Sequence, residues 1–533
     1  MTSTAVETPR PRRIPAGSRV SRRTLATMAL CFVVCAGRSL QVWSQLHLGG
    51  FDVGIFDQGI RAYAHLHLPV SEMKNVHHNF PPDYSLLGDH FSPILALLAP
   101  LYWIWDDPRV LLLAQAALFA VGVPLIRRIA RRSFADLALP IPPERLVDVV
   151  GLVYATGWPL MSAAGAGFHE VAFAVPFTLL LLDASATRRY RLAGLAAVLL
   201  CLCKEDLGLI VGVFGLVLLL RSLRGGDRAG RVTGAAMLVL GPVVSAIQIE
   251  VLLPAMGGVR GYYWDYDRLG ADPVGVLTNV LGHPWLLVTA ATDQGVKLQL
   301  IGWIVGSLAL LPLGSLTSLC WLPLLAERLY STNPNHWTVT NQYDAFLWPF
   351  LLVAAVETFA RIAPRLSWAR LRALGGLTLV TALLTSLALG LVGWMWPPDL
   401  KASPTAQALI DAANRIPAGA SVEATNNVAP RLLSGHYVVI ADEIPRCMDY
   451  VLLPSKPILT FGFLTPDGPV QRARMLERHG YAVVSDEGGA ILLRKTPGAD
   501  VPGCHLPGPN SVPVREEVPP GQKLPLFSGG FHG

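Results

Sequence analysis

The chain has 533 residues, of which 52% are hydrophobic and only 15% are charged, and its mean hydropathy is +0.44. Soluble domains carry roughly 25% charged residues, and this chain has many apolar runs near the length that crosses a bilayer. These values exclude an ordinary soluble protein and indicate a polytopic membrane protein, whose first partner is the lipid bilayer. The formal net charge of +6 does not indicate nucleic-acid binding, because the arginines gather in short blocks between apolar runs, where they act as topology signals.

Eleven apolar runs are predicted to be transmembrane helices, and together they form an all-α membrane domain over residues 24–396. The runs are 24–43, 109–126, 147–163, 171–186, 191–203, 207–220, 232–253, 297–312, 315–330, 345–360 and 373–395. Arginine-rich blocks lie on one side of this arrangement, at 10–23, 127–132, 188–191, 221–231 and 361–372. We therefore expect an integral plasma (inner) membrane protein with a cytoplasmic N-terminus and an extracytoplasmic C-terminal region. Residues 1–23, rich in Pro, Arg, Ser and Thr, are predicted to be a disordered cytoplasmic tail.

The first outer loop, residues 47–93, is the most polar part of the membrane domain. Its candidate functional side chains are Asp52, Asp57, Gln58, Asp89 and His90. Asp52 and Asp57 stand five residues apart in a glycine-rich segment, which allows the backbone to approach a ligand closely. Aspartate in such a place could accept a proton or hold a divalent cation. Four histidines of the loop have no metal-site spacing and are interpreted as solvated residues, namely His65, His67, His77 and His78.

Further polar residues lie at outer turns between predicted spans. They are His169 and Glu170 after the third span, Lys204, Glu205 and Asp206 after the fifth, and Arg260 beside an aromatic patch at residues 262–267. A carboxylate at hydrocarbon depth costs several kcal/mol unless it is paired or hydrated, so these residues indicate a functional site. The alternative is that some of them only end helices at the headgroup level, and that Glu205 only pairs with Lys204 or caps the next helix.

The arginine pattern decides how many times two ambiguous stretches of the chain cross the membrane. Residues 191–220 have arginines at both ends, so two short spans keep both flanks on one side and deliver Lys204, Glu205 and Asp206 to the outer surface. Residues 91–105 are apolar but too few to cross comfortably, and counting them as a span would reverse every later arginine block. We expect an interfacial or re-entrant helix there.

The C-terminal region divides into two parts. Residues 397–495 are predicted to form a small extracytoplasmic α/β domain, because a helical pattern at 406–415 is followed by short Val-rich and Ile-rich runs. These runs are 421–423, 437–440, 450–453, 482–484 and 490–494. Residues 496–533 are dense in Pro and Gly and are predicted to be a disordered tail. Cys447 and Cys504 could form a disulfide in an oxidising compartment.

The polar segments together resemble a known family. The stretches FDVGIFDQ at 51–58, GDHFSP at 88–93, FHE at 168–170 and KED at 204–206 are similar to the pattern of the bacterial membrane family called domain of unknown function 2079 (DUF2079). The resemblance covers roughly residues 25–495. That family is similar in layout to the GT-C integral-membrane glycosyltransferases, which use polyprenyl-phosphate sugars and place an essential acidic residue in the first outer loop. The resemblance thus implies a GT-C-like core.

The function implied by this resemblance is transfer of a sugar from a polyprenyl-phosphate donor to a glycan, lipid or protein acceptor on the extracytoplasmic face. The leaving lipid phosphate is already anionic, so the main demands are deprotonation of an acceptor hydroxyl and neutralisation of phosphate charge. Asp52 matches the essential acid and is the expected catalytic base. The residues expected to bind substrate are Asp57, Gln58, Asp89, His90, His169, Glu170, Lys204, Glu205, Asp206 and Arg260. A divalent cation, Mg or Mn, could be held by Asp57, Asp89 and Glu170.

Two other classes of function compete with this interpretation. A multi-span transporter or lipid flippase would use Glu205 and Asp206 as outer-facing proton or ion sites. An inverted repeat would favour that class, and the sequence shows none. A non-catalytic membrane scaffold, whose outer domain binds a partner, predicts instead that the acidic positions can be changed without loss of function.

Overall fold

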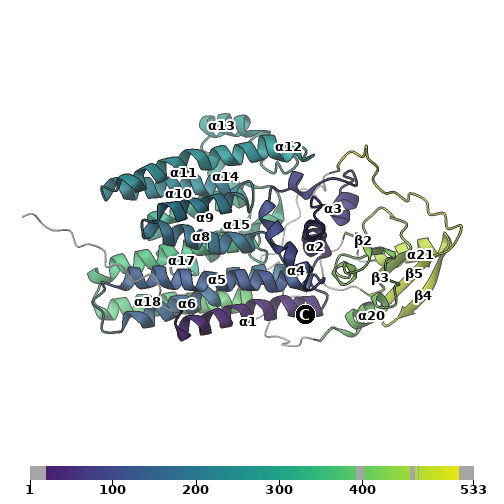
Figure 1. Cartoon of the computed structure of the whole chain (residues 1–533), viewed down its shortest axis with the longest axis horizontal. Helices are drawn as coiled ribbons and strands as arrows, with labels where there is room; N and C mark the ends of the chain where they lie inside the picture. The colour runs from purple at the N-terminus through teal and green to yellow at the C-terminus, as the bar shows by residue number, and fades with distance from the viewer. Residues whose placement is uncertain (1–19, 392–400, 457–462, 466, 515–533) are drawn as a thin grey trace, which may run out of the picture.

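The computed structural model describes residues 20–391, 401–456, 463–465 and 467–514. A bundle of helices is followed by a small domain with a five-stranded sheet, and a group of short helices lies between the two (Figure 1). The tail predicted at residues 1–23 lies almost entirely outside the described residues.

The helices of the bundle follow the apolar runs of the sequence. They are α1 (Arg22–Ser44), α5 (Arg109–Phe134), α6 (Pro143–Ala155), α7 (Trp158–Ala166), α8 (Val171–Ala186), α9 (Tyr190–Cys201), α10 (Leu207–Arg224), α11 (Arg228–Ile247), α17 (Tyr343–Ile362) and α18 (Trp368–Ser386). Within the described ranges, seven helices are long and apolar enough to cross a bilayer, or eight if the bent pair α13 (Pro273–Gly282) and α14 (Trp285–Thr292) is one span. Shorter apolar helices, α8 and α9 among them, occupy further predicted spans. The polytopic all-α membrane domain is confirmed.

Two predicted spans, 297–312 and 315–330, are broken in the structure. Their elements are α15 (Gly295–Gly306), η4 (Leu311–Gly314), η5 (Leu316–Trp321) and α16 (Leu322–Tyr330). The chain turns before η4 through Leu310, which has a φ of 61°, and Pro312 and Pro323 lack the N–H that a continuous helix would need. The nine-residue α16 is too short to cross a bilayer.

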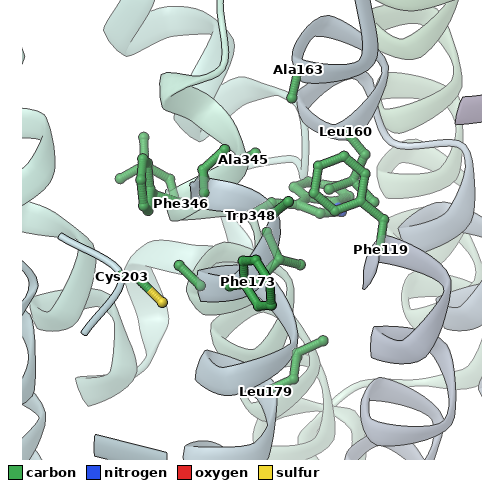
Figure 2. Packing of buried hydrophobic residues seen from close by; sticks show 14 of the residues in the cluster. Phe119, Leu160, Ala163, Phe173, Leu179, Cys203, Ala345, Phe346 and Trp348 are labelled. Atoms are coloured by element: carbon green, nitrogen blue, oxygen red, sulfur yellow. The ribbon is translucent and has the colours of Figure 1, made fainter. Parts of the chain in front are cut away.

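The buried centre of the bundle is packed around α17. Trp348 of α17 is buried among Phe119, Leu160 and Phe173, which come from three other helices (Figure 2). A Cβ added at Gly157 would lie 2.5 Å from the Trp348 ring, so only glycine admits this contact. Interiors at this density leave little room for rearrangement, and α17 therefore holds the surrounding helices in one arrangement.

The arginine blocks lie together at one end of the bundle. This end, the arginine face, comprises Arg127, Arg128, Arg131, Arg132, Arg188, Arg189 and Arg221 with their carboxylate partners. The buried carboxylate of Asp183 on α8 accepts hydrogen bonds from Arg128, Arg132 and Arg189 at 2.9, 2.5 and 3.2 Å. A buried charge requires such partners, and Asp183 thereby joins α5 to α8 at this face.

The opposite end of the bundle, the loop face, is covered by short helices. They are α2 (Gly50–Ala64), α3 (Glu72–His77), η1 (Leu86–Gly88), η2 (Pro93–Leu98) and α4 (Ala99–Tyr102) (Figure 1). The stretch 91–105, expected to be interfacial or re-entrant, contains η2 and α4 and forms a short apolar helix at Pro93–Tyr102. Connections from later in the chain also reach this end, namely η3 (Gln248–Leu252), α12 (Leu253–Ala255) and η6 (Pro334–Trp337).

The C-terminal domain is an α/β unit, as predicted. Its elements are α20 (Pro404–Ala413), β1 (Ser421–Ala424), η9 (Ala429–Leu432), β2 (Tyr437–Ile440), β3 (Tyr450–Pro454), α21 (Gly468–Arg478), β4 (Tyr481–Glu487) and β5 (Ala490–Lys495). The sheet order is β2-β1-β3-β5-β4, with β1 parallel to both neighbours and β5 antiparallel to both of its own. Alternate residues face opposite sides: Leu452 and Leu492 pack with α20, and Val451 and Leu493 pack with α21.

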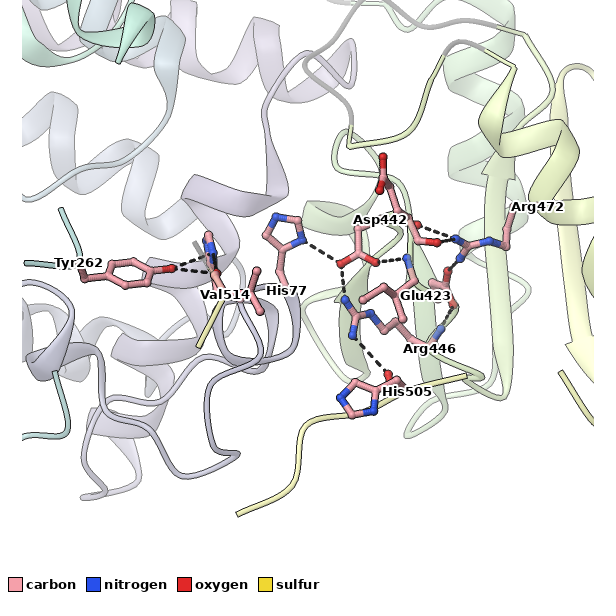
Figure 3. A network of polar contacts seen from close by, with 11 residues as sticks. His77, Tyr262, Glu423, Asp442, Arg446, Arg472, His505 and Val514 are labelled. Carbon is pink, nitrogen blue, oxygen red and sulfur yellow. Dashed lines mark hydrogen bonds and ion pairs between the residues drawn. The ribbon is translucent and has the colours of Figure 1, made fainter. Parts of the chain in front are cut away.

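Residues 496–514, part of the tail predicted to be disordered, run as extended chain back toward the loop face. The predicted disulfide between Cys447 and Cys504 is present, with Cα atoms 5.8 Å apart. Beyond it, the backbone N–H of Val514 donates to the carbonyl of His78 at 2.8 Å. The hydroxyl of Tyr262 contacts both of these residues (Figure 3). Residues 515–533 lie outside the described residues.

Candidate functional site

Asp52 lies on the first turn of α2, two residues after the glycine pair at 49–50. Its side chain is 55% exposed, and its Oδ1 lies 3.8 Å from Nε2 of His169. A carboxylate in the first turn of a helix interacts favourably with the unpaired N–H groups there. Asp52 is therefore an accessible carboxylate beside an imidazole, an arrangement suited to accepting a proton.

His169 is buried on the turn between α7 and α8, and the side chain of Gln115 on α5 hydrogen bonds to the backbone of this turn. Gln115 accepts from the N–H of His169 at 3.2 Å and donates to the carbonyl of Gly167 at 2.7 Å. Gly167 has a φ of 101°, and a Cβ there would lie 2.7 Å from Val53 of α2. Glycine thus permits both the turn and its close contact with α2. Glu170, the next residue, is buried at the start of α8.

The turn between α9 and α10 contributes three charged residues. Glu205 accepts from Nδ1 of His90 at 2.8 Å and from the N–H of Phe91 at 3.0 Å. Lys204 Nζ lies 3.3 Å from Asp206 Oδ2. Asp206 Oδ1 is buried and has no hydrogen-bond partner within the described residues. The structure therefore brings the end of the first loop against the Lys-Glu-Asp triplet.

These charges keep one another ionised. Burial alone would lower the pKa of His90, but Glu205, with Asp89 nearby, raises it to about 9. Burial alone would likewise lower the pKa of Lys204, but Asp206 and the surrounding carboxylates hold it well above its ordinary value. Burial raises the pKa of Asp206, and Lys204 offsets part of this effect. At neutral pH His90 and Lys204 are thus both cationic, and each lies beside a carboxylate, Glu205 for the first and Asp206 for the second.

Three further residues at the loop face belong to this site and were not predicted as site residues. The charge of Glu327 on α16 acts on Lys204, and Tyr343 at the start of α17 is within the electrostatic reach of both Asp52 and Lys204. Burial, together with the Lys204 cation, lowers the pKa of His336 to about 3, so this imidazole is neutral. The signal for Glu327 was a lone carboxylate inside a predicted span, which by itself marks a candidate site.

Asp57 and Gln58, both predicted to bind substrate, instead hold α2 in place. Buried Asp57 accepts two hydrogen bonds from Arg61, at 3.2 and 3.0 Å, and one from the hydroxyl of Tyr102 at 2.6 Å. Gln58 donates to the carbonyl of Val438 on β2 at 3.3 Å. Tyr102 and Val438 are distant in the sequence, so these two side chains connect α2 to α4 and to the sheet.

Asp89 and Arg260 also have partners of their own. Lys74 lies 3.0 Å from Asp89, and the hydroxyl of Tyr263 hydrogen bonds to the same carboxylate. Burial would raise the pKa of Asp89, but Lys74 holds it below its ordinary value. Arg260 is 72% exposed, and within the described residues its hydrogen bond and its ion pair both go to Glu250. Arg260 is therefore not brought to the charged cluster.

The predicted metal ligands Asp57, Asp89 and Glu170 do not form one site. Asp57 and Asp89 are each neutralised by a different cation, Arg61 for the first and Lys74 for the second. Across the described ranges, no group of three or more His, Cys, Asp or Glu residues is arranged so that it could hold a metal ion. This set of residues does not fit a divalent cation, and no chemical step below is assigned to one.

The comparisons with known proteins agree with a membrane protein. The model of a family described as predicted membrane protein (DUF2079) matches residues 42–453. Among solved structures, the chain is similar to the crystal structure of ArnT from Cupriavidus metallidurans in the apo state, with 13% sequence identity and a TM-score of 0.49. That similarity covers 90% of this chain and 99% of the other. No curated protein matches the sequence.

Proposed function

The chain belongs to the DUF2079 family of predicted membrane proteins, and from its site we propose that it transfers a sugar from a polyprenyl-phosphate donor to an acceptor at the extracytoplasmic face of the membrane. The observation that carries the proposal is the accessible carboxylate of Asp52 beside His169, at the same end of the bundle as two partly buried cations, His90 and Lys204. A proton acceptor and fixed positive charge are the two requirements for glycosyl transfer from a lipid phosphate.

The reaction can be written on these residues. Asp52 accepts the proton of an acceptor hydroxyl, and the hydroxyl oxygen attacks the anomeric carbon of the sugar. The bond from that carbon to the phosphate oxygen breaks, and the lipid phosphate leaves with the bonding electron pair. Lys204 and His90 stabilise the negative charge of the departing phosphate, a role that fixed cations perform best in a partly buried site. His169, whose Nε2 lies 3.8 Å from Oδ1 of Asp52, places an imidazole beside the base.

The two ends of the bundle support the proposed orientation. The arginine face gathers Arg128, Arg132 and Arg189 around Asp183, and arginine-rich ends stay in the cytoplasm. The loop face and the α/β domain, at the opposite end (Figure 1), are then extracytoplasmic. The acceptor, a glycan, lipid or protein, approaches from that side, and the donor's lipid tail remains in the bilayer.

The transporter alternative receives less support from the same geometry. Both carboxylate oxygens of Glu205 are engaged, one by His90 and one by the N–H of Phe91. A carboxylate that must bind and release a proton or ion in each cycle would have to give up these two bonds each time. Asp52, the exposed carboxylate, lies on a short helix of the first loop and not inside a span.

The test is transfer of radiolabelled sugar from a panel of polyprenyl-phosphate sugars in membranes that contain wild-type protein, Asp52→Asn or Asp83→Asn. Asp83 is exposed in the same loop and is the matched control. We expect transfer by wild type and Asp83→Asn, and a loss of at least about 100-fold in Asp52→Asn at equal expression. Undiminished transfer by Asp52→Asn would remove Asp52 from the mechanism. No transfer by wild type from any donor would overturn the proposed function.

A further inference from the structure

The N-terminus of α2 lacks a cap from its own segment. A helix leaves its first N–H groups without intrahelical partners, and Ser, Thr, Asp or Asn at the N-cap position normally accepts from them. The N-cap residue of α2 is Gly49, which has no side chain and makes no cap hydrogen bond. Asp52 lies two residues beyond the first residue of this helix, so whatever holds this turn also sets the position of the carboxylate.

Asn426 of the α/β domain supplies the missing cap. Its Oδ1 accepts from the N–H of Phe51 at 2.7 Å, and its backbone carbonyl accepts from the N–H of Gly50 at 2.6 Å. The residue is buried, and it follows β1 directly after Thr425. One residue, 375 positions away from Phe51 in the sequence, therefore satisfies the first two N–H groups of α2.

The contact between α2 and Asn426 leaves little room for a side chain at either glycine. A Cβ added at Gly49 would lie 3.1 Å from Nδ2 of Asn426, and one added at Gly50 would lie 2.8 Å from Cβ of Ala429 and 2.9 Å from the carbonyl oxygen of Asn426. The glycine pair noted in the sequence thus allows the backbone of α2 to approach this protein's own C-terminal domain.

The place of Asn426 in the sheet explains how it can reach α2. Strands β2, β1 and β3 are parallel, with β1 in the middle, so their carboxyl ends lie along one edge of the sheet. In open α/β sheets, the crevice outside these ends is where ligands bind. Here the first turn of α2 is held by Asn426, the second residue after the end of β1. The domain uses this edge to hold a helix of the same chain.

Other contacts from the same edge hold the rest of the first loop. His77, at the end of α3, lies 2.9 Å from Asp442, which follows β2 and is in turn bonded to Arg446 (Figure 3). The ring of Phe51 packs against Phe463 with centroids 5.4 Å apart. These contacts fix the orientation of the domain, so that Asn426 meets α2 in one register.

We propose that Asn426 is a positioning residue for the reaction, and that it holds Asp52 at the place where an acceptor hydroxyl is deprotonated. The inference rests on the proposed function, because the role of Asp52 does. An asparagine provides the acceptor oxygen without adding a negative charge beside the base. An aspartate would cap equally well but would disfavour ionisation of the neighbouring carboxylate.

The experiment measures the cap and the reaction separately, on full-length protein in detergent micelles. Hydrogen–deuterium exchange of the peptide that contains Gly50 and Phe51 reports the cap, and kcat and KM for sugar transfer report the reaction. The variants are Asn426→Ala, Asn426→Asp and the control Asn427→Ala. Asn427 is equally buried, and its Nδ2 has no hydrogen-bond partner within the described residues, so its replacement reports the general cost of disturbing this loop.

In Asn426→Ala we expect hydrogen exchange of the Gly50–Phe51 peptide to become about 5-fold faster, as for loss of one helix cap. We also expect kcat to fall at least about 10-fold with little change in KM, because the base is displaced. Asn426→Asp should retain slow exchange and most of kcat, while the acid limb of its pH–rate profile moves to higher pH. The other titratable groups near Asp52 are His169 and Tyr343, and they are the same in every variant.

Four results would overturn the inference. Unchanged exchange in Asn426→Ala would show that the cap does not hold α2, and faster exchange with unchanged kcat would show that the cap does not position the base. Wild-type protein could transfer no sugar while hydrogen exchange still becomes faster in Asn426→Ala. The cap would then be real, but the proposed function would fail, and the positioning role of Asn426 with it. An equal fall of kcat in Asn427→Ala would also refute a specific role for Asn426.

Discussion

The ion pair between His90 and Glu205 is expected to stabilise the loop face at neutral pH and to lose this effect in alkaline solution. The pKa of His90 is raised from 6.5 to about 9 in the folded protein. Because the folded-state pKa is the higher one, the stabilisation is complete below about pH 6.5 and disappears as the pH rises through about 9. Glu205 has a lowered pKa, so its own contribution is lost only on the acid side, below its ordinary range.

The size of the effect follows from the same values. At about 1.4 kcal/mol for each pKa unit, the difference between 6.5 and about 9 corresponds to about 3 kcal/mol for a fully buried group. The side chain of His90 is 35% exposed, and solvent screening reduces the expected coupling to about 1–2 kcal/mol.

A double-mutant cycle with His90→Ala, Glu205→Ala and the double variant isolates this pair from the other titrating groups. Thermal unfolding in detergent micelles at pH 7 and pH 10.5 is the assay, and His67→Ala, a change at an exposed histidine of the same loop, is the control. We expect a coupling of about 1–2 kcal/mol at pH 7 and close to zero at pH 10.5. An equal coupling at both pH values, or none at pH 7, would refute the reasoning.

Three further predictions concern the fold. Trp348→Ala should destabilise the bundle by about 3–5 kcal/mol through the cavity it leaves. The control Trp285→Ala, at an exposed ring, should change the unfolding temperature little. Equal decreases of the unfolding temperature in the two variants would contradict the packing described. Asp57→Ala should cost about 1–3 kcal/mol because the buried hydroxyl of Tyr102 loses its acceptor, and thermal unfolding that matches wild type would argue for a role other than structure. Cys504→Ser should make residues 505–514 more sensitive to limited proteolysis, measured by mass spectrometry, and an unchanged cleavage rate would show that the disulfide does not anchor this segment.

Local patterns predicted much of the fold. Helix α8 begins and ends at the residues expected from the apolar run, and β2 does the same in the α/β domain. In both cases the boundary depends on hydrophobic periodicity and on neighbouring polar residues, which are local properties. The bent pair α13 and α14 and helix α21 were not predicted. The apolar run of α13 and α14 is interrupted at His283 and Pro284, where the two helices bend apart. Helix α21 is short and largely polar, so that tertiary packing decides its structure.

The site was harder to predict, because partners that are distant in the sequence decide what a polar residue does. Asp57 and Gln58 were expected at the substrate, but Tyr102 and Val438 engage them. Glu327 was overlooked inside an apolar run that the structure divides into short helices. The two short helices on either side of the triplet at 204–206 were predicted, because the arginine pattern constrained the number of crossings there.

Because Asn426 caps α2, the proposed catalytic site is completed late in the synthesis of the chain. The contacts that complete the first loop come from Asn426, Val438 and Val514, which are 375, 380 and 436 residues from their partners. A ribosome makes the chain from its N-terminus at roughly 5–20 residues per second, and domains fold as they emerge. The membrane helices are therefore inserted well before α2 acquires its cap, and the proposed base reaches its working position only when nearly the whole chain has been made. Incomplete chains would occupy the membrane without carrying a finished site.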